Sequence, residues 1–273
     1  MKAVEDRYYL VDRPEPSEEF LYARHMTMAR LQRQFELKRG NAENEHADFR
    51  YIRTALTSPS FDDISFGYKN KVFSVFIDFV DDMFKSMTPE GCINTLIKVA
   101  NDNDLIPCIF PIRLNDMKPV SDGWNLYHAR TKAPVIPDKI AGNEPAEISE
   151  WEYNSWAINV VMNHLSEDTG KILSFCDAPG ILPQIWFENN NNEECWILVK
   201  YSVYPNIAEM DKDFVPPKMI LGFKGYFAGV SFCYADEINP EKRLFRNSPA
   251  FIRYLGLQEI WNGKMELTED MMQ

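Results

Sequence analysis

Five aspartates lie around one predicted β-hairpin, and they are the side chains of this chain best suited to catalysis. Asp62 and Asp63 precede the first strand, Asp78 lies in the second, and Asp81 and Asp82 follow it. Carboxylates on adjacent strands can share a Mg²⁺ ion, which stabilises the charge of an in-line displacement at phosphorus. The sequence therefore allows a metal-dependent phosphodiester hydrolase centred on Asp63 and Asp78.

The order of elements around these aspartates resembles the restriction-endonuclease-like fold, in which a helix precedes a hairpin with acids on both strands and a helix and a strand follow. That family carries a proline and an acid on one strand and an acid-x-lysine triplet on the next. Here Asp78 is followed by Val80 where the lysine should be. A second hairpin offers Lys200, but Gln184 and Leu198 replace its acids. Neither hairpin is complete, so the hydrolase is our alternative hypothesis.

The motifs that usually accompany cofactors are missing from the sequence. There is no GxGxxG, no GxxxxGK[ST] and no GxSxG segment. The four histidines and five cysteines are scattered singly, whereas zinc and iron sites need several such ligands within reach of one ion. We therefore expect no cofactor and no structural metal, and we favour a binding or accessory protein over an enzyme.

Aromatic side chains around the hairpins are the main candidates for binding. If exposed, they would form a platform for a small ligand or a partner protein; if interior, they are ordinary core residues. In a strand, the Trp186 side chain points to the face opposite to those of Ile185 and Phe187. One of these two faces must therefore be less buried, or it must be covered by a helix. The candidates are Trp124, Trp186, Trp196 and Tyr204.

A second polar candidate is the pair His128 and Arg130 in the segment NLYHARTK. A histidine and an arginine can together hold an anionic group. A surface loop with incidental charges is the competing interpretation.

The charge balance disfavours nucleic acid as a partner. The chain has 273 residues with 29 basic and 41 acidic side chains, a net charge of −12 that repels phosphate backbones. No apolar run approaches the roughly 20 residues of a transmembrane helix, and the first residues lack the apolar core of a signal peptide. The cysteines are odd in number with no CxxC pair, so we expect reduced, buried thiols and a soluble cytoplasmic protein without a membrane segment.

The first half of the chain predicts helices and one hairpin. Ser17 can cap a basic helix that ends near Gly40. Its basic side is either an ordinary solvated helix face or a docking surface for an acidic partner or another subunit. A second helix is expected over residues 43–56, and the hairpin over 63–79. Another helix begins near Thr88, and residues 105–114 read as a strand whose two prolines predict an edge position or a bulge.

The second half repeats this pattern after a proline-rich linker within residues 117–146. Ser149 and Glu152 stand in capping-box register at the start of a helix. A hairpin with an asparagine turn follows over residues 181–204, then two strands around Gly225, and a short helix within residues 239–256.

These expectations combine into an α+β fold of antiparallel, hairpin-rich sheets covered by helices. The shared element order suggests two diverged copies of one α+β unit, because an internal repeat preserves the order of its elements. We divide the chain into an N-terminal helical arm (1–44), a first unit (45–142), a second unit (143–262) and a frayed tail (263–273). Binding is expected on the aromatic surface or in the groove between the two halves.

Overall fold

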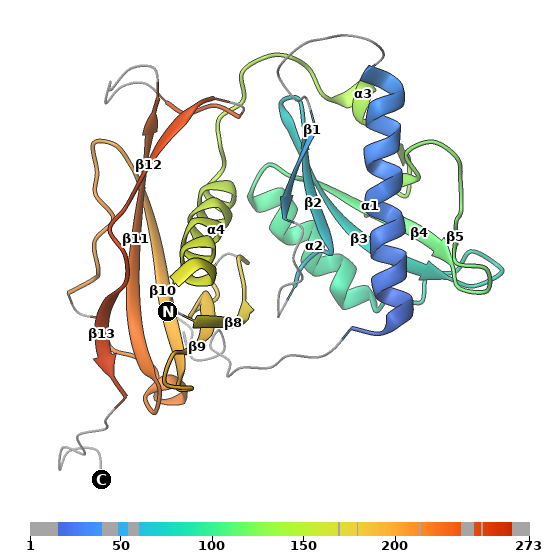
Figure 1. Cartoon of the computed structure of the whole chain (residues 1–273). Helices are drawn as coiled ribbons and strands as arrows, with labels where there is room; N and C mark the ends of the chain where they lie inside the picture. The colour runs from blue at the N-terminus through green and yellow to red at the C-terminus, as the bar shows by residue number, and fades with distance from the viewer. Residues whose placement is uncertain are drawn as a thin grey trace.

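The chain folds into two mixed β-sheets with helices on their faces, which confirms the α+β prediction (Figure 1). The computed structural model describes residues 16–39, 49–53, 60–168, 170–178, 180–212, 214–235, 243–246 and 248–263. The predicted tail, apart from its first residue, lies outside the described residues.

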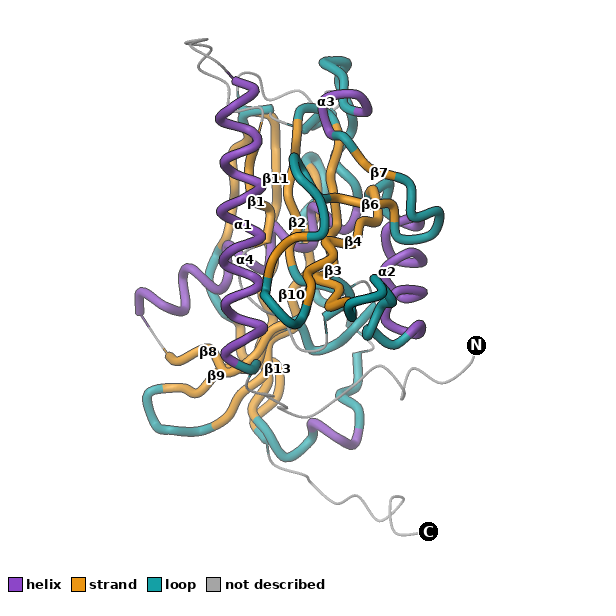
Figure 2. Tube along the Cα trace, turned by 90° about the vertical axis from the view of Figure 1, so that its right-hand side faces the viewer, coloured by secondary structure: helices purple, strands orange, loops and turns teal. Residues whose placement is uncertain are grey.

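The first sheet has the strand order β1-β2-β3-β4-β6-β7, with β5 also paired to β4. β3 and β4 are parallel and are joined through α2, while the other pairs are antiparallel. Helices α1 and α2 cover opposite faces of this sheet (Figure 2). The bounds are α1 Glu18–Arg39, β1 Phe49–Arg53, β2 Ile64–Tyr68, β3 Lys71–Val80, α2 Glu90–Asp102, β4 Ile106–Arg113, β5 Lys118–Pro119, β6 Leu126–His128, β7 Pro134–Val135 and α3 Pro137–Ile140.

The second sheet has the order β12-β11-β10-β9-β8, with β13 also paired to β11. β10 and β11 are parallel, and the other pairs are antiparallel. One face packs on α4, and the other packs on the loop between β10 and β11 and on β13. The bounds are α4 Glu150–Asp168, β8 Gly170–Phe175, β9 Ile185–Asn189, β10 Glu194–Val203, a 3₁₀ turn Lys218–Ile220, β11 Lys224–Tyr234, β12 Ala250–Tyr254 and β13 Gln258–Asn262.

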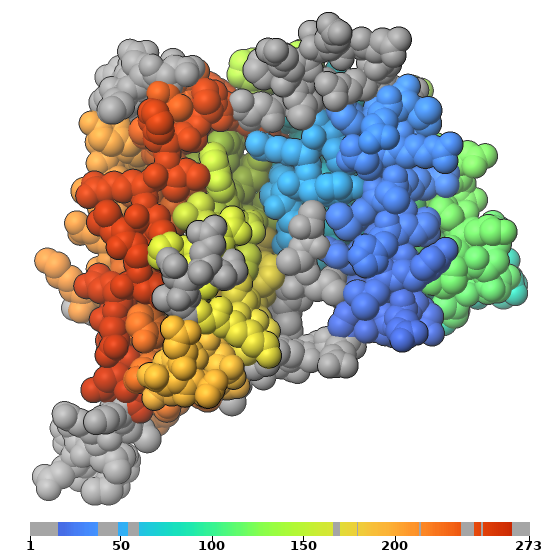
Figure 3. Space-filling view, viewed as in Figure 1, coloured from blue at the N-terminus to red at the C-terminus, as the bar shows by residue number. Residues whose placement is uncertain are grey.

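Helix α4 lies between the two sheets and contributes to both cores. Ile158, Val161 and Leu165 are buried against the second sheet. Trp151 packs instead into the core of the first sheet, where its ring meets Phe61 edge-on at 5.9 Å. In the space-filling view the yellow-green atoms of α4 separate the light-blue atoms of β1 from the orange-red second sheet (Figure 3).

The predicted hairpins and the helix caps at Ser17 and Ser149 are confirmed, whereas the hydroxyl of Thr88 donates to Asp78 and does not cap α2. β2 and β3 turn through Lys69, and β9 and β10 turn through Asn192, both with positive φ. Ser149 and Glu152 form the capping box, each side chain accepting the other residue's backbone N–H at 3.2 and 2.9 Å. Ser17 accepts the Phe20 N–H at 3.2 Å. Local polar side chains therefore fix these turns and caps, as the sequence indicated.

The predicted helix over residues 43–56 is wrong where the structure describes it. Residues 49–53 form strand β1, which pairs with β2 from Phe49 opposite Tyr68. Phe49 and Ile52 fit a helical spacing, but FRYIR is also rich in aromatic and β-branched residues that favour strands. Pairing with β2 decides between these two local preferences.

The strand containing Pro107 and Pro111 is interior rather than at an edge. β4 pairs with β3 along one side and with β5 and β6 along the other. The carbonyls of Pro107 and Pro111 accept N–H groups of Ala129 (2.9 Å) and Val120 (3.2 Å), on the side of β5 and β6. Because a residue's nitrogen and carbonyl point to the same side of a strand, the missing donors face the short strands and the ladder with β3 is intact.

Three further predictions are corrected. The segment around Gly225 is one strand, β11, because Gly225 lies opposite Trp196 and leaves room for the indole ring. Within residues 239–256, the described part contains strand β12 instead of a short helix. The segment 117–146 is not an open linker, since β5, β6, β7 and α3 fold onto the first sheet.

The helical arm packs on the first sheet along its length. Ala23, Leu31 and Phe35 of α1 are buried in its core. Arg24 is also buried and donates from Nε to the Asp63 carbonyl at 3.2 Å. Arg30 donates to the carbonyls of Ser121 and Gly123, both at 2.9 Å. Part of the basic face of α1 therefore serves intramolecular contacts.

The two sheets share a strand order. β1-β2-β3-β4 and β8-β9-β10-β11 each run antiparallel, antiparallel, parallel, and each set follows a helix. They differ in the crossover, which is helix α2 in the first and a loop with a 3₁₀ turn in the second. The duplication stays a prediction.

Candidate functional site

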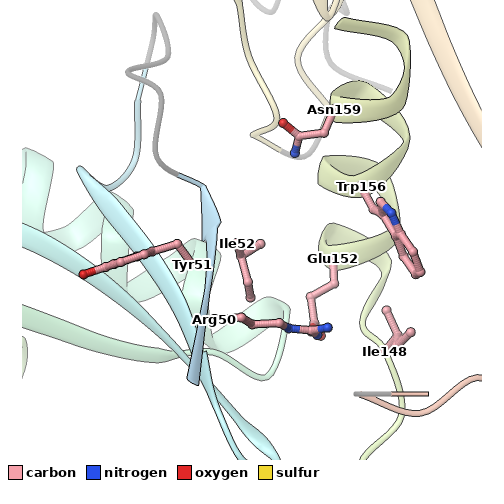
Figure 4. A pocket seen from close by; sticks show the side chains of 7 residues that line it. All are labelled: Arg50, Tyr51, Ile52, Ile148, Glu152, Trp156 and Asn159. Carbon is pink, nitrogen blue, oxygen red and sulfur yellow. The ribbon is translucent and has the colours of Figure 1, made fainter. Parts of the chain in front are cut away.

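A cleft of about 170 Å³ lies between strand β1 and helix α4, where the two halves of the chain meet. Arg50 and Ile52 extend from β1 toward α4, and Glu152 extends back toward Arg50 (Figure 4). Tyr51 points to the other face of β1, where its hydroxyl donates to the Met28 carbonyl at 2.6 Å. The cleft is lined by Arg50, Tyr51, Ile52, Ile148, Glu152, Trp156 and Asn159.

Glu152, which lines the cleft, forms an ion pair with Arg246. Arg246 donates from Nε and Nη2 to the Glu152 carboxylate at 2.8 to 3.1 Å. Their side chains are only 5% and 2% exposed. Arg246 Nη1 also donates to the Asn70 carbonyl at 2.7 Å, which ties the pair to the β2–β3 turn. The Glu152 charge is therefore neutralised inside the protein.

Arg50 differs from Arg246 because it has no hydrogen bond or ion pair with the part of the chain that the structure describes. Desolvation lowers the pKa of its guanidinium, an effect that Glu152 opposes and Arg246 reinforces. Arginine nevertheless keeps its charge at neutral pH. Gly67 lies opposite Arg50 in the β1–β2 ladder, and its missing side chain leaves space for the Arg50 stem. The guanidinium is thus a charged donor available to a ligand.

The remaining lining is largely apolar. Ile52 and Ile148 provide aliphatic surface, and Trp156 is fixed by packing on Phe232 with ring centroids 4.7 Å apart. Asn159 donates to the Ser155 carbonyl at 2.8 Å. An apolar wall with few polar groups is typical of small-molecule sites.

A second ionic network crosses between the halves beside the cleft. Arg53 pairs with Asp62 and, at 3.3 Å, with Asp177, and all three side chains are at most 3% exposed. Asp177 also accepts the Ser155 hydroxyl at 2.9 Å. Asp62 accepts the Ser65 hydroxyl at 2.5 Å. Two buried networks therefore link the first sheet to the second half, one through Arg53 of β1 and one through the β2–β3 turn.

The aspartates of the hydrolase hypothesis are both buried and hydrogen-bonded. Asp63 accepts the Ile77 N–H at 2.7 Å, and burial raises the pKa of its carboxyl to about 6. Asp78 accepts the hydroxyls of Ser86 and Thr88 at 2.7 and 2.8 Å. Among the described residues, no group of three or more His, Cys, Asp and Glu side chains could hold a metal ion.

The candidate tryptophans are core residues. Trp124, Trp186 and Trp196 are 5%, 1% and 0% exposed, so these three do not form a surface platform. Trp186 and Trp196 lie on one face of the second sheet, and the β10–β11 loop covers this face. The loop therefore buries the side of β9 on which Trp186 lies. Tyr204 is 42% exposed at the start of this loop and lies apart from the cleft lining.

The pair His128 and Arg130 forms part of a turn. The His128 ring accepts the backbone N–H groups of Arg130 (3.2 Å) and Thr131 (3.4 Å) through Nδ1. Desolvation, and then the Arg130 charge, lower the pKa of His128. The imidazole therefore supports the turn, and the Arg130 side chain is exposed.

Sequence reasoning anticipated a groove between the halves but not its residues. Glu152 was recognised for its capping role alone, and Arg50 was placed in a helix. Arg246 lies 94 residues from Glu152 in the chain, so no local spacing links them. Glutamates are mostly exposed in proteins, and nothing in the sequence marks this one as buried.

One family model matches the chain, over residues 151–260, and its description is a domain of unknown function (DUF8840). The matched segment contains Glu152 and Arg246 but not Arg50. No curated protein and no solved structure matches. Among the described residues, no helix combines the length and apolar character needed to cross a membrane.

Proposed function

We propose that this protein binds a small organic anion in the cleft between β1 and α4. The observation that carries the proposal is Arg50, a guanidinium with no hydrogen bond or ion pair among the described residues, beside apolar side chains. Because the Glu152 carboxylate pairs with Arg246, which also pairs with Asp104 at 3.6 Å, the Arg50 guanidinium is the cation of the cleft lining that has no ion pair among the described residues. Charge-assisted bonds from arginine to carboxylates are among the strongest in proteins.

The size and lining of the cleft restrict the ligand further. Apolar cavities of about 150 Å³ hold a benzene molecule, and this cleft measures about 170 Å³. Ile52, Ile148 and Trp156 suit a compact hydrocarbon group next to the anion. A monocarboxylate with one ring or a short branched chain therefore fits best.

Benzoate is the probe of choice, titrated into the full chain and followed by calorimetry. We expect saturable binding, and we expect Arg50→Gln to weaken it about ten- to hundredfold, because a hydrogen bond to a charged group contributes about 1.5–3 kcal/mol. Arg130→Gln is the matched control, since it removes an exposed arginine outside the cleft. Benzyl alcohol, a neutral analogue, should bind at least tenfold more weakly than benzoate.

Three outcomes would count against the proposal. These are no benzoate binding to the wild-type chain, equal binding by the Arg50→Gln variant, and a loss of binding in Arg130→Gln. The last result would instead support the anion site predicted at His128 and Arg130.

The hydrolase stays the alternative prediction. Binding is favoured because Asp63 and Asp78 are already engaged by neighbouring N–H and hydroxyl groups. A protein partner, a soluble cytoplasmic location and association through α1 also remain predictions. Tyr22 and Leu37 on α1 are 59% and 64% exposed, so Tyr22→Ser with Leu37→Ser is the variant to compare by light scattering for oligomeric state.

A further inference from the structure

A second hollow, of about 410 Å³, lies where the last turn of α4 meets the asparagine turn between β9 and β10. It is separate from the cleft and uses none of its residues. The second sheet continues beyond the end of α4 (Figure 1), and Tyr226 of β11 is only half-buried in this region. The lining residues are His164, Phe187, Asn189, Asn190, Asn191, Tyr226 and Leu257.

The four asparagines of this turn have unequal roles. Asn189 builds the turn, because its side-chain oxygen accepts the N–H groups of Asn191 and Glu193 at 2.9 and 3.0 Å. Asn192 supplies the left-handed residue, with φ of 59°. Asn190 and Asn191 have no positive φ, and their side-chain amides make no hydrogen bond within the described residues. The backbone therefore does not explain why these two residues are asparagines.

The turn presents these two amides from a rigid position. Asn189 also donates to the Glu193 carboxylate at 2.9 Å, and Glu193 pairs with Lys224 of β11 at 2.6 Å. Each amide offers two donors and one acceptor oxygen. A fixed turn loses little conformational freedom when a ligand binds, which favours recognition.

The half-buried Tyr226 ring forms the aromatic floor of the hollow, and Phe187, which is only 2% exposed, packs against it. Phe187 and Tyr226 lie with ring centroids 5.6 Å apart, and the Tyr226 hydroxyl has no hydrogen bond among the described residues. The His164 ring is fixed by an edge contact with Tyr254 at 5.1 Å. No lysine, arginine or carboxylate lines the hollow. The site thus combines aromatic surface with neutral hydrogen-bonding groups.

We propose that this hollow binds a neutral saccharide. A sugar ring has an apolar C–H face that packs on an aromatic ring and hydroxyl groups that exchange hydrogen bonds with amides. The absence of charged lining groups removes the means to hold an anion or a cation. The volume is within the usual range for small-ligand sites, about 300–1,000 Å³.

The test is saturation-transfer NMR of the full chain with the neutral disaccharides cellobiose, maltose and lactose. We expect saturation transfer from at least one, with the side-chain amide signals of Asn190 and Asn191 shifting on titration. The double variant Asn190→Ala, Asn191→Ala should bind at least tenfold more weakly. Asn192→Gly is the matched control, because it keeps the left-handed geometry and its position does not line the hollow; it should bind within twofold of wild type.

Saturation transfer from none of the three sugars would overturn the proposal. So would unchanged binding in the folded double variant, or amide shifts confined to other parts of the chain. If the double variant does not fold, the amide shifts of the wild-type chain decide the question alone. Because Arg50 is not involved, failure here leaves the anion-binding proposal intact.

Discussion

Replacing Arg246 with methionine tests whether the Glu152–Arg246 pair holds the two halves together. Both side chains are at most 5% exposed, so the variant leaves the Glu152 carboxylate buried without its counter-ion. Removing one partner of a buried ion pair typically lowers the free energy of unfolding by about 3–5 kcal/mol. The Asn70 carbonyl also loses a donor at 2.7 Å, which puts the expected loss toward the upper part of that range.

The assay is urea unfolding followed by tryptophan fluorescence, with Arg243→Met as the matched control. Arg243 lies three residues before Arg246 in the chain and pairs with Glu147. The Arg243 and Glu147 side chains are 71% and 56% exposed, so this pair should contribute less than about 1 kcal/mol. Glu152→Gln in the Arg246→Met background should recover part of the lost stability, because a neutral amide is less costly to bury. Equal effects of Arg246→Met and Arg243→Met would refute the reasoning.

Three further predictions use other features of the structure. Burial raises the pKa of Asp63 from 3.8 to about 6, so this carboxyl stabilises the folded state less as the pH rises. Between pH 4 and 7 the wild-type free energy of unfolding should fall by about 2 kcal/mol relative to Asp63→Asn, and parallel pH curves would disprove this. Gly225→Ala should destabilise the folded protein by about 3 kcal/mol or more, because the added methyl group meets the buried Trp196 ring. This ring is held in place by a 3.1 Å hydrogen bond from its Nε1–H to the Ile220 carbonyl. An unchanged thermal unfolding curve would contradict this prediction. Millimolar Mg²⁺ or Mn²⁺ should leave the melting temperature unchanged, whereas a rise that Asp78→Asn abolishes would favour the hydrolase.

Local chemistry explains which elements could be predicted from the sequence. Asn189 and Asn192 mark the second hairpin because asparagine tolerates left-handed backbone and bonds to neighbouring N–H groups. Ser149 and Glu152 mark the start of α4 because both halves of a capping box lie within one turn. These signals act over a few residues, so they are visible without the fold.

Non-local packing explains what the sequence did not reveal. β1 was predicted as helix because Phe49 and Ile52 fit a helical period, and the ladder with β2 selects the strand instead. Pro107 and Pro111 were placed at an edge because the sequence does not show which side of the strand lacks its donors. The cleft depends on Arg50, Glu152 and Arg246, which three separate segments bring together. Their common position is a property of the tertiary structure alone.

The most direct test of the anion site is the NMR signal of the Arg50 Nε–H group during titration with benzoate. The account predicts that this signal shifts and saturates with benzoate, and stays in place with benzyl alcohol, because a carboxylate accepts a charge-assisted bond that an alcohol does not match. An Arg50 signal that does not move while the protein binds benzoate would contradict the account, since the anion would then lie elsewhere.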